Sequence, residues 1–131
     1  MPLTSEEAFD LARQLRGAAV DIGNYRFKHW DELGKARREK LEVLEWDLAV
    51  GAMQTTTAGV GLALEEVDTS LTALRDATGK ARKAIKTLED VRKVIKVATA
   101  LVGLAAAVAS KDPVAVAKNA KKVYEIATED A

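Results

Sequence analysis

Apolar residues recur at steps of three and four through most of the second half of the chain. The repeat comprises Leu64, Val67, Leu71, Leu74, Thr78, Ala81, Ile85 and Leu88, then slips by one residue and resumes as Val91, Ile95, Ala98, Val102, Ala105 and Ala109. This spacing is typical of a helix that packs lengthwise against another helix, and it predicts one long helix over residues 62–110. The spacing holds across Gly79 and Gly103, which favours continuity. A break at Gly79, giving a more compact bundle, is the alternative.

The N-terminal half carries shorter patterns that predict two further helices. Thr4 and Glu7 form a capping-box pair ahead of a helix over residues 4–22. Gly23 and Asn24 mark a break, and apolar positions at helical spacing then predict a helix over residues 24–50.

Three glycines and three successive threonines interrupt the pattern between residues 51 and 61. Threonine is a poor helix residue because its Cβ is branched, and glycine is poorer still. We therefore expect the main reversal of the chain within this segment.

The clearest boundary lies near the C-terminus, at Asp112 and Pro113. Asp is a favoured N-cap and Pro suits the first helical position, so a final helix is predicted over residues 113–128. The predicted fold is a single all-α domain spanning residues 1–131. It is an elongated antiparallel hairpin or bundle with one long heptad helix and a short C-terminal helix.

Composition narrows the classes of function and location. Twenty basic residues balance twenty acidic ones, so no overall charge attracts nucleic acid or an anionic membrane. The chain has no cysteine, which excludes disulfides and thiolate chemistry. It begins without a Sec-type signal pattern, and no uncharged stretch is as long as a spanning helix. A cytoplasmic location is the default expectation, while export by a route without a cleavable signal stays open.

Candidate catalytic and metal-binding residues are scarce. The single histidine is His29, and Arg26 stands where the Glu of a helical di-iron Glu-x-x-His motif would be. The acidic pairs at 65–66 and 89–90 fall off the apolar stripe, and no Walker-type glycine loop occurs. We predict a non-enzymatic protein with no cofactor and no metal.

Aromatic residues gather near the middle of the N-terminal half. Tyr25, Phe27 and Trp30 lie within six positions, and helical rotation separates Tyr25 from the other two by about 140–160°. Either Trp30 lies in the core, with Phe27 at its edge and Tyr25 stacked on a neighbouring helix, or these residues anchor a protein interface. Trp46 lies roughly on the opposite side of the helix from Trp30. All four aromatic residues are candidate interface residues.

Basic residues cluster between positions 75 and 96, with Arg75, Arg82, Lys86 and Lys93 at steps of seven, four and seven. Nucleic-acid binding would use such a stripe for phosphates, but no aromatic residue lies nearby to stack on bases. The pattern disfavours a nucleic-acid partner. We expect a solvated face, or one neutralised by the acidic residues at 6–10.

The uncharged segments 48–64 and 97–110 raise a second class of function. Gly51, Gly59 and Gly61 suit either a turn or close helix contacts within a membrane. Charged amphipathic helices around an apolar tongue resemble, over residues 25–110, the architecture of helical pore-forming toxins of the cytolysin-A type. This resemblance implies a membrane-active component.

The function predicted first is different. It is an interaction or assembly module that uses its apolar helix faces to bind a protein partner or to form a homo-oligomer. Membrane activity is the alternative.

Overall fold

A computed structural model describes residues 3–58, 62–64 and 70–129, and this part of the chain contains five α-helices and no strand. The helices are α1 (Ser5–Lys28), α2 (Lys35–Ala58), α3 (Leu71–Thr87), α4 (Val91–Ala109) and α5 (Pro113–Thr128). The all-α class predicted from the sequence is confirmed.

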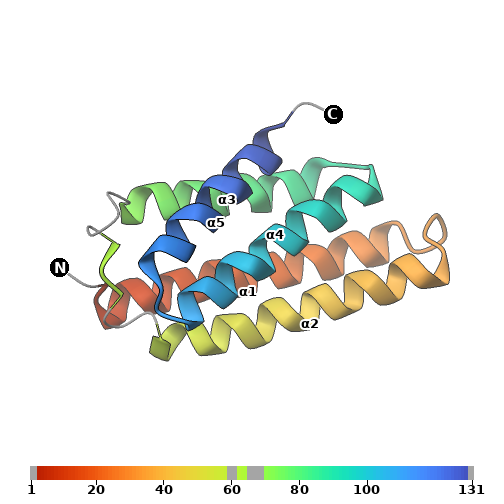
Figure 1. The fold of residues 1–131 in the computed structure, drawn as a ribbon. Helices are drawn as coiled ribbons and strands as arrows, with labels where there is room; N and C mark the ends of the chain where they lie inside the picture. Colours follow the sequence, from red (N-terminus) through yellow and green to blue (C-terminus); the bar gives the residue numbers. More distant parts are fainter. Residues whose placement is uncertain (1–2, 59–61, 65–69, 130–131) are drawn as a thin grey trace.

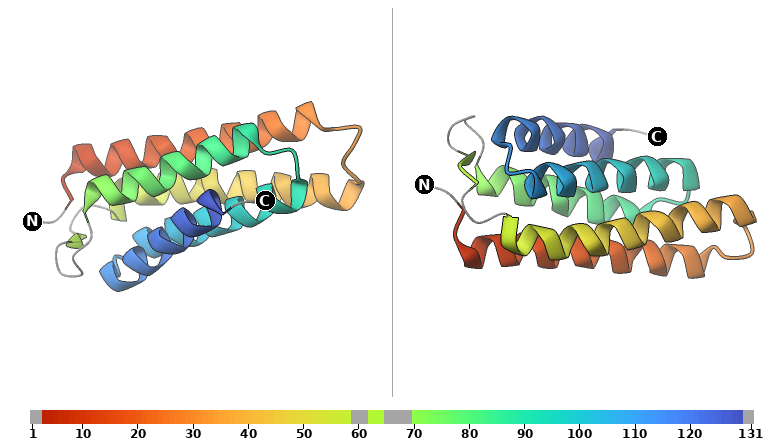
Figure 2. Two further views of the ribbon diagram at one scale, coloured as in Figure 1. Left: turned by 90° about the horizontal axis from the view of Figure 1, so that it is seen from above. Right: turned by 60° about the horizontal axis from the view of Figure 1, so that its bottom comes forward.

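The helices stack in three layers (Figures 1 and 2). The antiparallel pair α1–α2 forms the first layer, and the antiparallel pair α3–α4 forms the second. Helix α1 packs on α3 and α2 packs on α4, whereas α5 packs on both α3 and α4. The α3–α4 layer is therefore enclosed between the α1–α2 pair and α5.

Helix α4 occupies the centre of this stack and contacts α2, α3 and α5. Its buried residues are Val91, Val94, Val97, Ala98, Ala100, Leu101, Leu104, Ala105, Ala107 and Val108. A helix that is apolar nearly all round needs neighbours on more than one side, and α4 has them. Each buried Leu or Val side chain contributes about 1.5–3 kcal/mol relative to exposure, so α4 anchors the core.

The predicted long helix over residues 62–110 is wrong, because the chain turns at residues 88–90 between α3 and α4. The turn lies where the apolar repeat slips by one residue. Asp90 begins α4 as its N-cap, accepting a hydrogen bond from the Arg92 backbone N–H at 3.0 Å. The alternative break at Gly79 is also wrong, because Gly79 lies inside α3.

The break predicted at Gly23 and Asn24 is wrong as well, because α1 continues to Lys28. Gly23 is buried, and the Glu45 carboxylate lies 2.9 Å from the position that a Cβ would occupy there. Gly23 therefore does not end a helix, and the space beside it is occupied by the end of the Glu45 side chain.

Helix α2 also extends further than predicted, through the threonine-rich segment to Ala58. The hydroxyls of Thr55 and Thr56 donate to the carbonyl oxygens of Gly51 and Ala52 at 2.8 and 3.2 Å, so both threonines are accommodated inside the helix. The main reversal predicted within residues 51–61 is therefore absent from residues 51–58, and residues 59–61 lie outside the described part of the chain. The chain reverses earlier, between the end of α1 at Lys28 and the start of α2 at Lys35.

Both predicted helix starts with clear capping signals are confirmed. Thr4 and Glu7 make the reciprocal capping-box hydrogen bonds at the start of α1, at 2.9 and 3.1 Å. Asp112 caps α5, and its carboxylate accepts from the backbone N–H groups of Val114 and Ala115.

Replacing Gly51 or Gly79 with alanine is expected to change stability in opposite directions. Nothing lies within 4 Å of a Cβ built at exposed Gly79, so Gly79→Ala gains helix propensity and stabilises the fold by about 0.5–1 kcal/mol. A Cβ on Gly51 would lie 2.8 Å from the Ala105 Cβ on α4, so Gly51→Ala forces α2 and α4 apart and costs about 1–3 kcal/mol. Denaturant unfolding of both variants measures the two signs, and equal stabilisation would contradict the close contact.

The Tyr25 side chain ties the end of α1 to the α3–α4 turn. Its hydroxyl donates to the Glu89 carbonyl oxygen at 2.6 Å. Burial raises the pKa of Tyr25 above its ordinary value of 10.0, and the nearby carboxylates of Asp90, Glu32 and Glu89 raise it further. The folded protein therefore holds this proton more tightly than the unfolded chain does.

The Tyr25→Phe variant is expected to lose about 0.5–1.5 kcal/mol at neutral pH, because the hydrogen bond is lost. The stability due to the raised pKa is fully present below about pH 10 and is lost as pH rises beyond it, so the wild type weakens more steeply there than the variant. Urea unfolding between neutral pH and about pH 11 tests this, with Tyr124→Phe at an exposed tyrosine as the matched control. Parallel pH curves for wild type and Tyr25→Phe would refute the assignment.

Candidate functional site

Helix α2 carries two apolar stripes on opposite sides. The inner stripe, Leu41, Leu44, Leu48 and Ala52, is buried in the core. The second stripe is Val43, Trp46, Val50 and Met53, spaced by three, four and three residues. All four of its residues are exposed, Trp46 at 71% and Met53 at 68%. Helical rotation places the two stripes about 170° apart, so the fold covers only the inner one.

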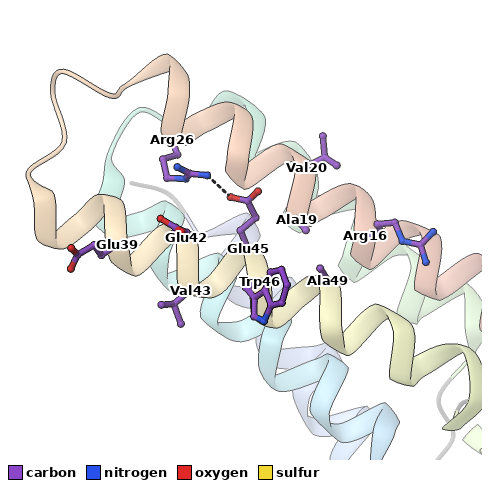
Figure 3. Close-up of a pocket in the computed structure, with 10 residues that line it drawn as sticks. All are labelled: Arg16, Ala19, Val20, Arg26, Glu39, Glu42, Val43, Glu45, Trp46 and Ala49. Atoms are coloured by element: carbon purple, nitrogen blue, oxygen red, sulfur yellow. Dashed lines mark hydrogen bonds and ion pairs between the residues drawn. The ribbon is translucent and has the colours of Figure 1, made fainter.

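Helix α1 exposes three large apolar side chains, Phe9, Val20 and Phe27, and helical rotation places them on one side of the helix. Phe9 lies near the start of α1, where it lines a separate groove with Arg13 and with Arg75 of α3. Val20 lines the same groove as Val43 and Trp46, between α1 and α2 (Figure 3). We call the six residues Val20, Phe27, Val43, Trp46, Val50 and Met53 the outer apolar face.

The groove within this face has a volume of about 930 Å³ and a floor of small side chains. Ala19 of α1 and Ala49 of α2 leave room between the helices, and Trp46 stands beside them (Figure 3). Arg26 and Glu45 bridge α1 and α2 through an ion pair of 3.0 Å. The Arg26 side chain is mostly buried, so this pair fixes the spacing of the two helices under the groove.

Charged residues lie at both ends of the groove. Arg16 lies at one end, and Glu39 and Glu42 lie at the other, where Arg26 is paired with Glu45 (Figure 3). An apolar centre with charged margins matches the anatomy of protein interfaces, in which charge is depleted from the core and kept at the rim.

The four aromatic residues predicted as candidate interface residues divide between core and surface. Tyr25 is only 5% exposed, and its ring lies 4.3 Å from the ring of His29, so it belongs to the core. Phe27, Trp30 and Trp46 are all exposed. The interpretation that placed Trp30 in the core is wrong, because that side chain is 42% exposed.

Phe27 and Trp30 form a stacked pair at the loop end of α1, with ring centroids 5.9 Å apart. The guanidinium of Arg26 lies 4.8 Å from the Phe27 ring, and that of Arg38 lies 4.7 Å from the Trp30 ring. Such cation–π contacts hold exposed aromatic rings in fixed positions.

Sequence reasoning missed Val20, Val43, Val50 and Met53. The sequence does contain a pattern for three of them, since Val43, Val50 and Met53 repeat with Trp46 at helical spacing. Leu41, Leu44 and Leu48 form a stronger apolar pattern over the same residues, and that pattern alone accounts for a core-facing side of the helix. Two stripes on one helix indicate two apolar surfaces.

The candidate membrane or turn segment is helical as far as it is described. Gly51 is buried where α2 meets α4, whereas Gly59 and Gly61 lie outside the described residues. Most of segment 97–110 is the buried part of α4. None of the helices in the described ranges is long and apolar enough to cross a membrane.

The basic stripe of α3 is partly neutralised by acidic residues of α1. Arg75 pairs with Asp10 at 2.8 Å, as the sequence suggested for the acidic residues near the N-terminus. Arg82 pairs with buried Asp21 at 2.8 Å, and Lys86 lies 3.9 Å from the same carboxylate. Within residues 3–58, 62–64 and 70–129, no group of three or more His, Asp or Glu side chains is placed to hold a metal ion.

The outer apolar face is therefore the candidate functional site. In comparisons with known proteins, no family model, no curated protein and no solved structure matches this chain.

Proposed function

We propose that this chain is a non-enzymatic interaction module that associates with a further copy of itself through the outer apolar face. The observation that carries this proposal is the second apolar stripe of α2, which the described helices leave exposed. A contiguous apolar patch bordered by polar residues marks an interaction site, whereas scattered apolar side chains do not.

The residue types on this face support association with a protein. Trp and Met are enriched at the centre of interfaces, and a large aromatic residue in that position supplies much of the binding free energy. At about 25 cal/mol per Å², burying a few hundred Å² of apolar surface contributes several kcal/mol before the entropic cost of association. The face is thus sufficient for a reversible complex.

The exposed apolar residues of α5 make a useful contrast. Val114 and Tyr124 are exposed but lie ten residues apart on one helix, and no stripe connects them. Isolated residues of this kind are normal on protein surfaces. They provide the matched control for the proposed surface.

Membrane activity is the competing function, and it would require a change in the fold. Segment 97–110 contributes most of the core of α4, and Gly51 packs against Ala105. Insertion of these segments into lipid would require the three-layer stack to open. Association through the outer apolar face requires no rearrangement.

The Trp46→Glu variant is expected to weaken self-association at least about tenfold while the helical content and melting temperature are retained, because Trp46 is exposed. Sedimentation velocity over a concentration series measures the effect, with Tyr124→Glu on α5 as the matched control. A wild type that stays monomeric up to about millimolar concentration would overturn the proposal, as would equal behaviour of the two variants. Release of dye from anionic vesicles by the wild type would favour the membrane function.

A further inference from the structure

The order of charges along the α1–α2 pair specifies how a second copy would dock. We infer that the second copy packs on the outer apolar face with each helix antiparallel to its counterpart, so that the arginine end of one face lies beside the glutamate end of the other. This inference rests on the proposed self-association and adds the orientation of the partner.

The two helices carry matching patterns with opposite charges. On α1, Arg13 and Arg16 precede Val20 by seven and four residues. On α2, Glu39 and Glu42 precede Trp46 by the same seven and four residues. Because α1 and α2 are antiparallel, the arginines and the glutamates extend in opposite directions from the centre of the face. Figure 3 shows Arg16 on one side of Trp46, and Glu39 and Glu42 on the other.

The four charged side chains lie on the same side of the helices as the apolar residues. At about 100° per residue, Arg13 and Arg16 lie within about 40° of Val20 around α1. Glu39 and Glu42 lie within about 40° of Trp46 around α2. All four are exposed. Arg16, Glu39 and Glu42 line the groove between α1 and α2, whereas Arg13 lies at the margin of the face, in a groove that also includes Arg75 of α3.

The sign of the charge changes again near the N-terminal ends of α1 and α2. Glu6 lies beyond the arginines on α1, and Lys35 lies beyond the glutamates on α2. By the same rotation both fall within about 40° of the centre line, and both are exposed. Phe9 lies between Glu6 and Arg13 on the same side of α1. From one end of the face to the other the charges alone are acidic, basic, acidic and basic, an order that is complementary to itself when reversed.

These charges are largely unused within the described chain. No described residue forms an ion pair with Arg16, Glu39 or Glu42. Arg13 lies 3.5 Å from Asp10 and 5.8 Å from the centre of the Phe9 ring, both on its own helix, and its side chain is 65% exposed. A pair of this kind contributes little to stability, so the arginine remains available to a partner.

Antiparallel and parallel docking have opposite electrostatic consequences. Antiparallel docking brings Arg13 and Arg16 of each copy beside Glu39 and Glu42 of the other, on both sides of the twofold axis. Parallel docking brings arginines beside arginines and glutamates beside glutamates. Like charges across an interface are strongly unfavourable, and opposite charges set the orientation.

The size of the face suits a copy of the same α1–α2 pair. Helix α1 has 24 residues and α2 has the same number, so each is about 36 Å long. Two adjacent helices are about 20 Å wide, so the outer side of the α1–α2 pair, with its charged ends, has a footprint of about 700 Å². A standard interface buries about 800 Å² on each partner, which is close to the footprint of a second helix pair, whereas a single helix would cover about half of it.

Charge reversal at the two ends tests the orientation. One variant is Arg13→Glu/Arg16→Glu and the other is Glu39→Arg/Glu42→Arg. Each alone is expected to weaken self-association at least about tenfold, because the ends that meet then carry like charges. Mixed in equal amounts, the two variants are expected to recover a dimer of near wild-type affinity, which sedimentation velocity and native mass spectrometry detect as a heterodimer.

A double reversal on α5, Lys118→Glu/Lys121→Glu, changes the net charge by the same amount as Arg13→Glu/Arg16→Glu. It does so at exposed sites away from the face and should leave the dimer unchanged. Circular dichroism and thermal melting confirm that each variant is folded. The wild-type dimer should also weaken several-fold between about 50 mM and about 500 mM salt, because screening reduces attraction between opposite charges. Parallel docking predicts instead that the dimer strengthens as the salt concentration rises, because screening reduces repulsion between like charges.

The absence of cysteine allows a second readout of orientation. Chains with Arg16→Cys and chains with Glu42→Cys should form a mixed disulfide faster than either forms a disulfide with itself. Faster self-linkage at position 16 would overturn the antiparallel orientation, as would a failure of the charge-reversed chains to recover when mixed. Either result, with a Trp46-dependent wild-type dimer, would leave the proposed function standing, whereas a monomeric wild type would end both.

Discussion

The structure depends on the need to cover α4 on nearly every side. From Val97 to Ala109 this helix has no charged side chain, and most of its residues are buried. An apolar helix of this kind is stable in water only when other helices surround it, and each contact removes surface from solvent at a gain of about 25 cal/mol per Å². The positions of α2, α3 and α5 around α4 follow from that requirement.

The same requirement explains the small residues of α2. Gly51 and Ala52 are buried, and a Cβ on Gly51 would come within 2.8 Å of the Ala105 Cβ. The two helices can approach this closely only because neither presents a large side chain at the crossing. With its inner side committed to α4 and α1, α2 is left with Trp46 and its neighbours facing away from the core.

The helical class, the α5 boundaries and both capping signals could be predicted from the sequence because each depends on local chemistry. Thr4 with Glu7, and Asp112 with Pro113, act within one helical turn. The path of the chain could not be predicted in the same way. Gly23 and Gly51 suggested breaks, but both lie inside helices. Gly51 allows α4 to approach closely, and that contact depends on residues far away in the sequence.

The division of the expected long helix was signalled by the one-residue slip before Val91, which coincides with the turn at residues 88–90. Because the apolar spacing holds across Gly79 and Gly103, the sequence favoured one continuous helix. Exposure was equally hard to predict for the aromatic residues. Tyr25 is buried because the α3–α4 turn offers a carbonyl to its hydroxyl, and that partner lies 64 residues away.

The placement of α5 bears on how many copies the proposed association would join. Helix α5 covers the side of the α3–α4 layer that faces away from the α1–α2 pair. In the proposed mode of association both copies use the same patch, so that patch is occupied in the first complex and is closed to a third copy. An assembly of this symmetry would stop at two chains and would not extend into a filament.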